Sequence, residues 1–444
     1  MTDALTVPVD PVSAGRLAAK NLVYRLVDNG SDADTEAFLR AEARGFLDAD
    51  PTPEQIAADR ALLAMRRNVG VFEENAPDGA FPVATVNSWV TPLTVPGGEV
   101  GMWAISAVTV SGTHRRRGIA RNLLEGELRA AAGAGVAVAG LTVSEATIYE
   151  RYGFASAIPA AKVSIDAPRA GWNGPATDGR VEYVERETLQ KDLSALHEQA
   201  RTQRSGQIAG WDARWERIAG LSVGHTAPRA VRGVRYVDAD GAVRGAMAYT
   251  LKEVAGSFRA DMEIHHLTST TTDALAALWR FALQHDLVSK VVVDLRPIDD
   301  PITWLVTDQR GVDLTPHDHG WLRLLDVPAA LSARTYRAPL DVVFRVEDPL
   351  GFAEGSWRLT SGADGTADVA RVDDGAEADV ILGVGALSSI YAGGVSAVRL
   401  RAAGRLHAST ETAAALDDAF RTADAPLLGL SLIHISEPTR LGMI

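Results

Sequence analysis

Residues 102–143 constrain the fold of this chain more than any other segment. Apolar and polar residues alternate through 102–110, as in a strand, and apolar residues then recur at helical spacing through 117–132. Residues 136–143 form an apolar run, which is typical of a buried strand. A strand, a loop, a helix and a strand in this order predict an α/β unit.

The segments before this unit predict more of the same domain. Residues 22–27 alternate like a first strand, and residues 34–44 and 54–66 have the spacing and start signals of helices. Residues 68–73 and 81–90 are strand-like. The chain before the first strand lacks periodicity, so we expect a loose arm there.

The length of 444 residues, at roughly 150 per domain, predicts about three domains. The strand and helix pattern restarts near residue 160 in a similar order, which favours a structural duplicate. It changes again at 328–339, after which short strands precede helices. We therefore expect α/β and α+β domains at residues 1–158, 159–326 and 327–429, followed by a separate segment at 430–444.

The last of these segments, 430–444, differs in composition from the Ala-, Arg- and Gly-rich chain before it. It is similar to the translation of an adapter used in sequencing libraries. This favours a non-native tail that has replaced the original C-terminus. An ordinary flexible tail is the alternative interpretation.

Composition excludes several classes of protein. The chain has no cysteine, so disulfides, Cys-ligated zinc, iron–sulfur clusters and a Cys nucleophile are ruled out. No apolar run reaches the ~18 residues of a membrane span, and the start lacks the features of a secretory leader, so we expect a cytoplasmic protein without a membrane partner. The net charge of −13 argues against nucleic-acid partners and favours cationic ones.

The loop between the predicted strand and helix has the character of an anion site. It contains three consecutive arginines followed by glycine, Arg115, Arg116, Arg117 and Gly118. Backbone amides at a helix N-terminus bind pyrophosphate, and glycine lets the backbone approach the ligand closely. The loop has neither the Walker pattern nor the dinucleotide-binding glycine pattern. A basic helix cap on a solvated face is the alternative.

This loop resembles the pyrophosphate loop of the GNAT acetyltransferases. The motif THRRRG at 113–118, followed by Ser144, Glu145 and then Tyr149 ahead of an Arg-Tyr-Gly-Phe run, is similar to the Eis family of GNAT N-acetyltransferases. The resemblance implies tandem GNAT domains, of which the second lacks a working cofactor loop, and a C-terminal domain like sterol carrier protein. It also implies acetyl-CoA as cosubstrate, no metal, and a hexameric assembly.

The resemblance further assigns roles to individual residues. Tyr149 would be the general acid that protonates the departing thiolate; a buried tyrosine packed beneath Tyr152 and Phe154 is the alternative. The base would be the native terminal carboxylate, which is absent if the tail is foreign, since the present terminus is Ile444. Glu145 or a water chain would be weaker substitutes. The cofactor-binding residues would be Val108, Thr109, Val110, Arg115, Arg116, Arg117, Gly118, Ile119, Ala120, Arg121, Ser144 and Glu145.

The sequence predicts fewer residues of the acceptor pocket than of the cofactor site. Asp48, with other acidic residues nearby, lies where the family presents carboxylates to polyamines, although a solvated charge is an equal alternative. Trp89 and Trp103 fit the core better than the pocket. His317 and His319 lie in a predicted polar loop without a third ligand at a metal-site spacing, so we expect no metal there.

Together these features predict an acetyl-CoA-dependent N-acetyltransferase that transfers acetyl directly to a primary amine in a ternary complex. Aminoglycosides, acetylated at one or more amines, are the leading acceptors. A lysine acetyltransferase acting on protein or peptide is the second hypothesis. A non-catalytic CoA- or lipid-binding protein is the third.

Overall fold

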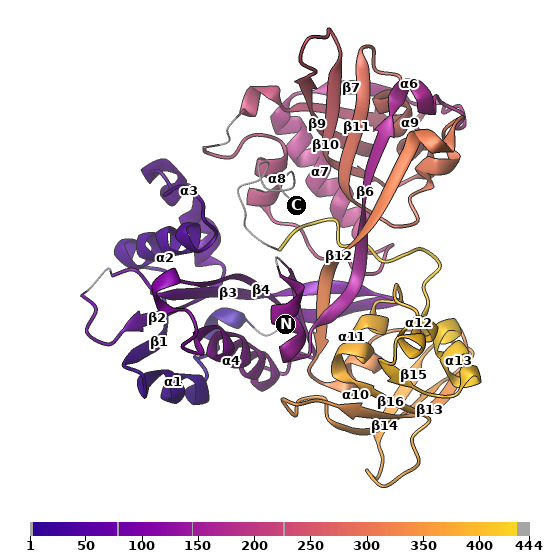
Figure 1. The fold of residues 1–444 in the computed structure, drawn as a ribbon. Helices are drawn as coiled ribbons and strands as arrows, with labels where there is room; N and C mark the ends of the chain where they lie inside the picture. The colour runs from indigo at the N-terminus through magenta and orange to yellow at the C-terminus, as the bar shows by residue number, and fades with distance from the viewer. Residues whose placement is uncertain (1–2, 78–79, 144, 225–226, 433–444) are drawn as a thin grey trace.

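The structure is a computed structural model that describes residues 3–77, 80–143, 145–224 and 227–432. It consists of three lobes (Figure 1). The first lobe contains α1 (Pro11–Ala18), β1 (Leu22–Leu26), α2 (Asp32–Gly45), α3 (Pro53–Ala64), β2 (Arg67–Glu73), β3 (Ala84–Val95), β4 (Gly98–Val110), α4 (Ile119–Gly133), β5 (Val138–Thr142) and α5 (Ala146–Tyr149).

The second lobe contains β6 (Ala155–Asp166), α6 (Ala167–Ala170), β7 (Arg180–Val184), α7 (Arg186–Arg201), α8 (Asp212–Ile218), β8 (Arg232–Val237), β9 (Val243–Glu253), β10 (Ala260–Ser269), α9 (Thr272–Leu283), β11 (Val288–Arg296) and β12 (Val312–Leu324). The third lobe contains α10 (Val327–Ser332), β13 (Leu340–Glu347), β14 (Gly355–Ser361), β15 (Ala367–Arg371), β16 (Val380–Gly383), α11 (Val384–Tyr391), α12 (Ala397–Ala402), β17 (Leu406–His407) and α13 (Thr410–Phe420).

One 12-stranded sheet runs through the first two lobes, in the order β1-β2-β3-β4-β5-β12-β6-β11-β10-β9-β8-β7. Strand β12 joins the lobes, because its first part pairs with β6 and its end, from Gly320 to Leu324, pairs with β5. Figure 1 shows β12 passing from the second lobe into the first. The predicted boundary at 158/159 falls inside β6, which pairs with β11 and β12.

Helices α2 and α4 cover opposite faces of β3 and β4 (Figure 1). On the α4 face, Glu127 accepts hydrogen bonds from Ser88 at 2.6 Å and Trp103 at 3.2 Å and pairs with the fully buried Arg67. The buried charge of Glu127 is tolerated because an ion pair and two hydrogen bonds replace its contacts with water. Trp103 is therefore a core residue, as expected.

The third lobe packs its helices on a five-stranded sheet, in the order β15-β14-β13-β16-β17. Buried arginines hold it together. Arg334 donates to the carbonyl oxygens of Tyr391 and Phe420, at the ends of α11 and α13, where the helix dipoles favour a cation. Arg323 of β12 pairs with Asp348 at 2.7 Å, both almost fully buried, which fixes the third lobe to the shared sheet.

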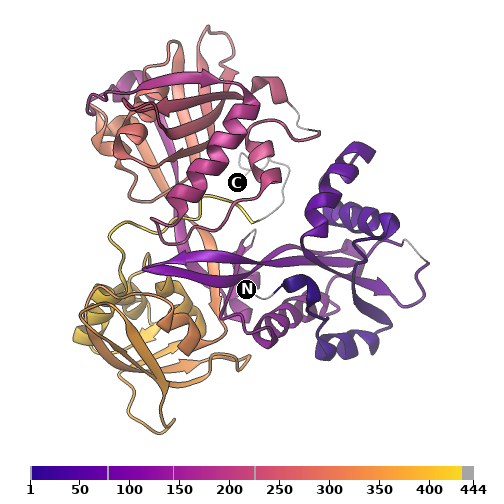
Figure 2. The ribbon, with the colours of Figure 1, turned by 180° about the vertical axis from the view of Figure 1, so that it is seen from behind.

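The chain after α13 returns to the other lobes. Figure 2 shows this segment, in yellow, crossing between the second and first lobes. Leu430 and Leu432 are buried there. In the described part of the chain no helix is long and apolar enough to cross a membrane.

Most of the elements that the pattern predicts are present, including α2, α3, β4, α4 and β5. Two expectations were wrong. The expected loose arm contains α1, because Asp10 caps this helix through Ser13 N at 2.7 Å and Leu17 is fully buried. The expected polar loop around His317 and His319 is part of β12, whose pairing with β6 stabilises an extended conformation despite its polar residues.

Candidate active site

Strands β4 and β5 run parallel and then part. Their pairing ends at Ala104 opposite Gly140. A β-bulge bends β4 just beyond this point: Ala107 and Val108 together face Val86 of β3, and Ala107 has a φ of 54°. The edge of β4 that follows is thus turned away from β5. Its backbone groups can pair with an extended ligand arm, as the residues predicted to bind pantetheine require.

β4 leads into the predicted anion loop at residues 111–118. Arg116 and Gly118 both have left-handed backbones, with φ of 65° and 76°, a geometry that turns successive N–H groups into one concavity. Gly118 is also the residue that precedes α4, and it has no side chain with which to cap the helix. The first amides of α4 therefore point toward the loop as donors for an anion.

The loop is anchored from two sides. His114 is buried and contacts Glu73 through Nε2 at 3.1 Å and Thr113 through Nδ1 at 2.8 Å. Lys20 donates from Nζ to the carbonyl oxygen of Arg117 at 2.6 Å. Sequence reasoning missed Lys20, because it lies 97 residues from its partner and belongs to no motif. It adds a fourth cation beside the three exposed arginines.

The first residues of α4 differ in whether their side chains lie in the core or at the surface near the loop. Ile119 is almost fully buried and Ala120 is half-buried. The guanidinium of Arg121 pairs with Glu125 at 2.6 Å, and Glu125 also binds Arg16 at 2.8 Å. The side chain of Arg121 is thus engaged along the helix, and its contribution to the loop is its backbone amide.

Tyr149 lies at the end of α5, after the C-terminal end of β5. It is buried in the core cluster that includes the inner face of α4, and its ring contacts that of Phe154 edge-on at 6.4 Å. Burial, with the nearby charge of Glu145, raises the pKa of Tyr149 to about 12. Its phenol therefore keeps its proton at neutral pH. Glu145 is exposed at the start of α5, and Ser144 lies outside the described residues.

Asp48 lies just beyond the C-terminal end of α2. Its side chain is half-exposed, and its backbone N–H donates to Ala43 O at 2.9 Å, which closes the helix. Leu47 beside it is 77% exposed. The neighbouring Asp50 lies 3.7 Å from Arg44 and is partly neutralised. Asp48 is thus a carboxylate at the rim of the α2 face.

Two charged residues on this face were missed by sequence reasoning. Glu42 of α2 is 5% exposed and Arg66 is 4% exposed. A signal existed for Glu42, because it continues the buried helical stripe of Thr35, Phe38 and Leu39. Trp89, expected in the core, is half-buried beneath Arg66, whose guanidinium lies 3.8 Å from its ring centre.

The returning chain meets β4 on the same face. Ser106 donates from Oγ to the carbonyl oxygen of Leu432 at 2.6 Å. Gly429 N donates to Gln207 Oε1 at 3.0 Å, and His319 Nε2 lies 3.3 Å from Leu430 O. The predicted terminal group, Ile444, lies outside the described residues.

Comparisons with known proteins show the family to which the chain belongs. Residues 27–157 and 206–324 each match an acetyltransferase (GNAT) domain model, and residues 327–429 match a sterol carrier protein domain model. An uncharacterized N-acetyltransferase of Streptomyces avermitilis is 35% identical over 89% of this chain and 96% of its own. The N-acetyltransferase Eis of Mycobacterium tuberculosis is 30% identical over 84% and 91%. The chain belongs to the Eis family of GNAT N-acetyltransferases.

A solved Eis-family structure has the same fold. Eis1 from Mycobacterium abscessus superposes with a TM-score of 0.78 at 30% identity, over 92% of this chain and all of that one. The predicted fold, two GNAT domains and a sterol-carrier-like domain, is therefore confirmed. The prediction of an acetyltransferase is confirmed as well. GNAT acetyltransferases use acetyl-CoA, and the parted strands with their anion loop suit that cosubstrate.

In the second GNAT domain of this Eis-family chain, the residues that the structure describes include no loop equivalent to 111–118. Only Thr270 and Thr271 link β10 to α9, and Thr271 Oγ1 caps the helix by accepting from Ala274 N at 3.2 Å. A capped helix N-terminus has one donor fewer for a phosphate. The uncapped start of α4 at Gly118 offers more free donors for a phosphate than the start of α9 does.

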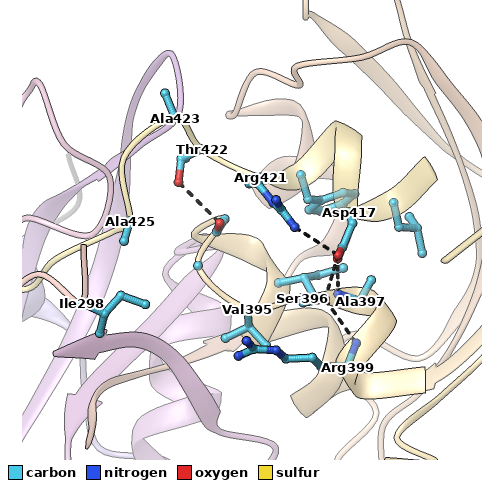
Figure 3. A pocket seen from close by; sticks show the side chains of 15 residues that line it. Ile298, Val395, Ser396, Ala397, Arg399, Asp417, Arg421, Thr422, Ala423 and Ala425 are labelled. Atoms are coloured by element: carbon cyan, nitrogen blue, oxygen red, sulfur yellow. Dashed lines mark hydrogen bonds and ion pairs between the residues drawn. The ribbon is translucent and has the colours of Figure 1, made fainter. Parts of the chain in front are cut away.

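A cavity of about 320 Å³ lies apart from these residues, between the third lobe and Ile298 (Figure 3). Asp417 accepts there from Ser396 Oγ at 2.7 Å and from the first amide of α12, Ala397 N, and Thr422 donates to Gly393 O at 3.4 Å. Its lining includes no residue of β4, α4 or α5. Within the described ranges, no group of three or more His, Asp or Glu side chains could hold a metal ion.

Proposed function

We propose that this chain transfers acetyl directly from acetyl-CoA to a primary amine in a ternary complex, with aminoglycosides as the leading acceptors. The observation that carries the proposal is the parting of β4 from β5 at Ala104, directly ahead of the uncapped start of α4. An extended thioester arm along β4 with its diphosphate at Gly118 would direct the acetyl group into the opening between the strands.

In this proposal different residues bind the cosubstrate and transfer the proton. Val108, Thr109 and Val110 hold the pantetheine arm, and the loop with Ser144 and Glu145 holds the rest of the cosubstrate. The amine attacks the thioester carbon, and the carbon–sulfur bond breaks as the intermediate collapses. Tyr149, which is protonated at neutral pH, donates its proton to the sulfur.

The choice of acceptor rests on charge. Asp48 lies at the rim of the α2 face, and the net charge of the chain is −13. Carboxylates attract polycationic amines and raise their local concentration. An aminoglycoside presents several such amines, so transfer to more than one of them is part of the proposal.

We also propose that the chain assembles as a hexamer and is located in the cytoplasm. This proposal rests on the family resemblance and on the composition. Analytical ultracentrifugation of the purified chain measures the assembly directly, and fractionation of expressing cells measures its location.

The test of the proposed activity is thiol release from acetyl-CoA with a panel of aminoglycosides and a lysine-containing peptide. Release that depends on an aminoglycoside, with one or more acetyl groups added by mass, supports the proposal. Release with the peptide alone favours a lysine acetyltransferase. A thermal shift with CoA and no release with any amine indicates a binding protein.

A further inference from the structure

Glu42 occupies an unusual place for a carboxylate, between α2 and the strands that carry the site. Gly45, three residues later, packs directly on Thr109 of β4: a Cβ at Gly45 would collide with the Thr109 side chain. Residues three apart share one helix face, so Glu42 points to the same side, one turn back along the helix. Only 5% of Glu42 is exposed.

One of the two carboxylate oxygens of Glu42 lacks a partner in the described part of the chain. Its Oε1 has no hydrogen-bond partner among the residues that the structure describes. A buried polar atom without a partner is costly and points to a ligand group that completes it. Four charged groups face it: Arg66 and Arg217 favour its ionised form, and Asp59 and Asp48 oppose it.

Arg66 connects Glu42 to the strands. Its guanidinium lies over Trp89 at 3.8 Å and near Trp211 at 5.4 Å, and its Nη1 donates to Asn87 Oδ1 at 3.5 Å. Asn87 lies directly opposite Ser106 in the β3–β4 pair. Arg66, whose charge acts on Glu42, thus contacts a side chain opposite Ser106, next to the bulge of β4 where the thioester is proposed to lie.

We propose that Glu42 accepts the first proton of the acceptor's ammonium group before the amine attacks. This inference rests on the proposed function. An N–H bond of the ammonium breaks, its proton moves to Glu42, and the electron pair stays on nitrogen. The nitrogen then bonds to the acetyl carbon, sulfur leaves with the proton of Tyr149, and the second nitrogen proton restores the phenol. The products are the acetamide, CoA thiol and protonated Glu42, so atoms and charges balance.

Two observations agree with this role. Glu42 approaches from the α2 face, whereas Tyr149 packs in the core on the α4 face, so base and acid flank the cosubstrate from opposite sides. Burial raises the pKa of Glu42 to about 7. A base is most effective when its pKa lies near the working pH.

The test is the pH profile of kcat/KM for neomycin, from pH 5.5 to 9, in the wild type, Glu42→Gln and Glu36→Gln. Glu36→Gln is the matched control, because it makes the same change on the half-exposed side of α2. We expect Glu42→Gln to lower kcat/KM about 10²-fold and to remove the acid limb centred near pH 7. The affinity for acetyl-CoA and the melting temperature should stay near wild-type values, as should every parameter of Glu36→Gln.

Arg66→Gln provides a second variant that keeps the carboxylate. Because Arg66 favours the ionised form, its loss should move the acid limb to higher pH. The role of Glu42 would be overturned if Arg66→Gln left the acid limb of the pH profile unchanged. It would also be overturned if Glu42→Gln kept the wild-type kcat/KM and the wild-type acid limb. Neither result would affect the proposed function. Absence of acetyl transfer to any amine by the wild type would instead overturn the proposed function.

Discussion

Ser106 of β4 donates a hydrogen bond of 2.6 Å to the carbonyl oxygen of Leu432, across 326 residues of sequence. The contact brings the end of the described chain onto the strand that is proposed to bind the thioester arm. Ser106 lies between Ala104, where β4 leaves β5, and the bulge at Ala107. The third lobe thus contributes its last segment to the first lobe's site.

Ending the chain at Leu432 should increase activity. A terminal carboxylate would then lie at Ser106, where it could act as an additional base for the acceptor's ammonium group, as the family resemblance implies. We expect kcat/KM to rise about 10-fold. Thiol-release kinetics measure the change, and adding Ser106→Ala should remove the gain. Equal rates for the full-length and shortened chains would contradict this role.

Tyr149→Phe should lower kcat by roughly 10²- to 10⁴-fold, because the thiolate would leave without a proton donor. The affinity for acetyl-CoA, measured by calorimetry, should remain within about twofold, since the ring still packs against Phe154. Tyr152→Phe is the control, because it removes a hydroxyl from the same core cluster. A Tyr149→Phe enzyme with unchanged kcat would leave only the packing role.

Gly118→Glu should abolish CoA binding. The residue has a φ of 76°, which disfavours any side chain, and a carboxylate would repel the diphosphate. Gly133→Glu is the matched control, because a Cβ there meets open space at the other end of α4. Calorimetry with CoA compares the two. Wild-type affinity in Gly118→Glu would exclude this loop as the binding site.

The titration of His319 should destabilise the fold as the pH drops from 6.5 toward 4. Burial lowers the pKa of His319 to about 4 and holds that of His266 well below its usual value. His319 and His266 bind more protons in the unfolded chain in this interval, so their titration favours unfolding, by about 3 kcal/mol for His319 alone. Glu42, whose pKa is raised to about 7, acts in the opposite direction between pH 7 and 4.5, so the contribution of His319 is the difference between the wild-type profile and that of a variant without this histidine. Urea unfolding at several pH values measures it, with His319→Asn as the variant expected to flatten the profile. A steeper decline in that variant would refute the attribution.

The local elements of the first lobe could be predicted because their signals are local. The helical spacing of α4 and the glycine before it are legible in a few neighbouring residues. The insertion of β12 between β5 and β6 was not predictable, because pairing over long separations stabilises a strand whose own residues are polar.

The same division applies to the candidate site. The loop and Tyr149 were predicted from a contiguous motif. Lys20, Glu42 and Arg66 were not, because each acts through partners from distant segments. Only the buried position of Glu42 on its helix carried a usable signal.

The central claim is that the first amides of α4 hold the diphosphate of CoA while β4 directs its thioester. A crystal structure with CoA tests it most directly. We predict phosphate oxygens at hydrogen-bond distance, about 3 Å, from the amides of residues 116–121, and the pantetheine arm along Val108–Val110. CoA bound instead at the start of α9 or in the cavity of the third lobe would contradict it.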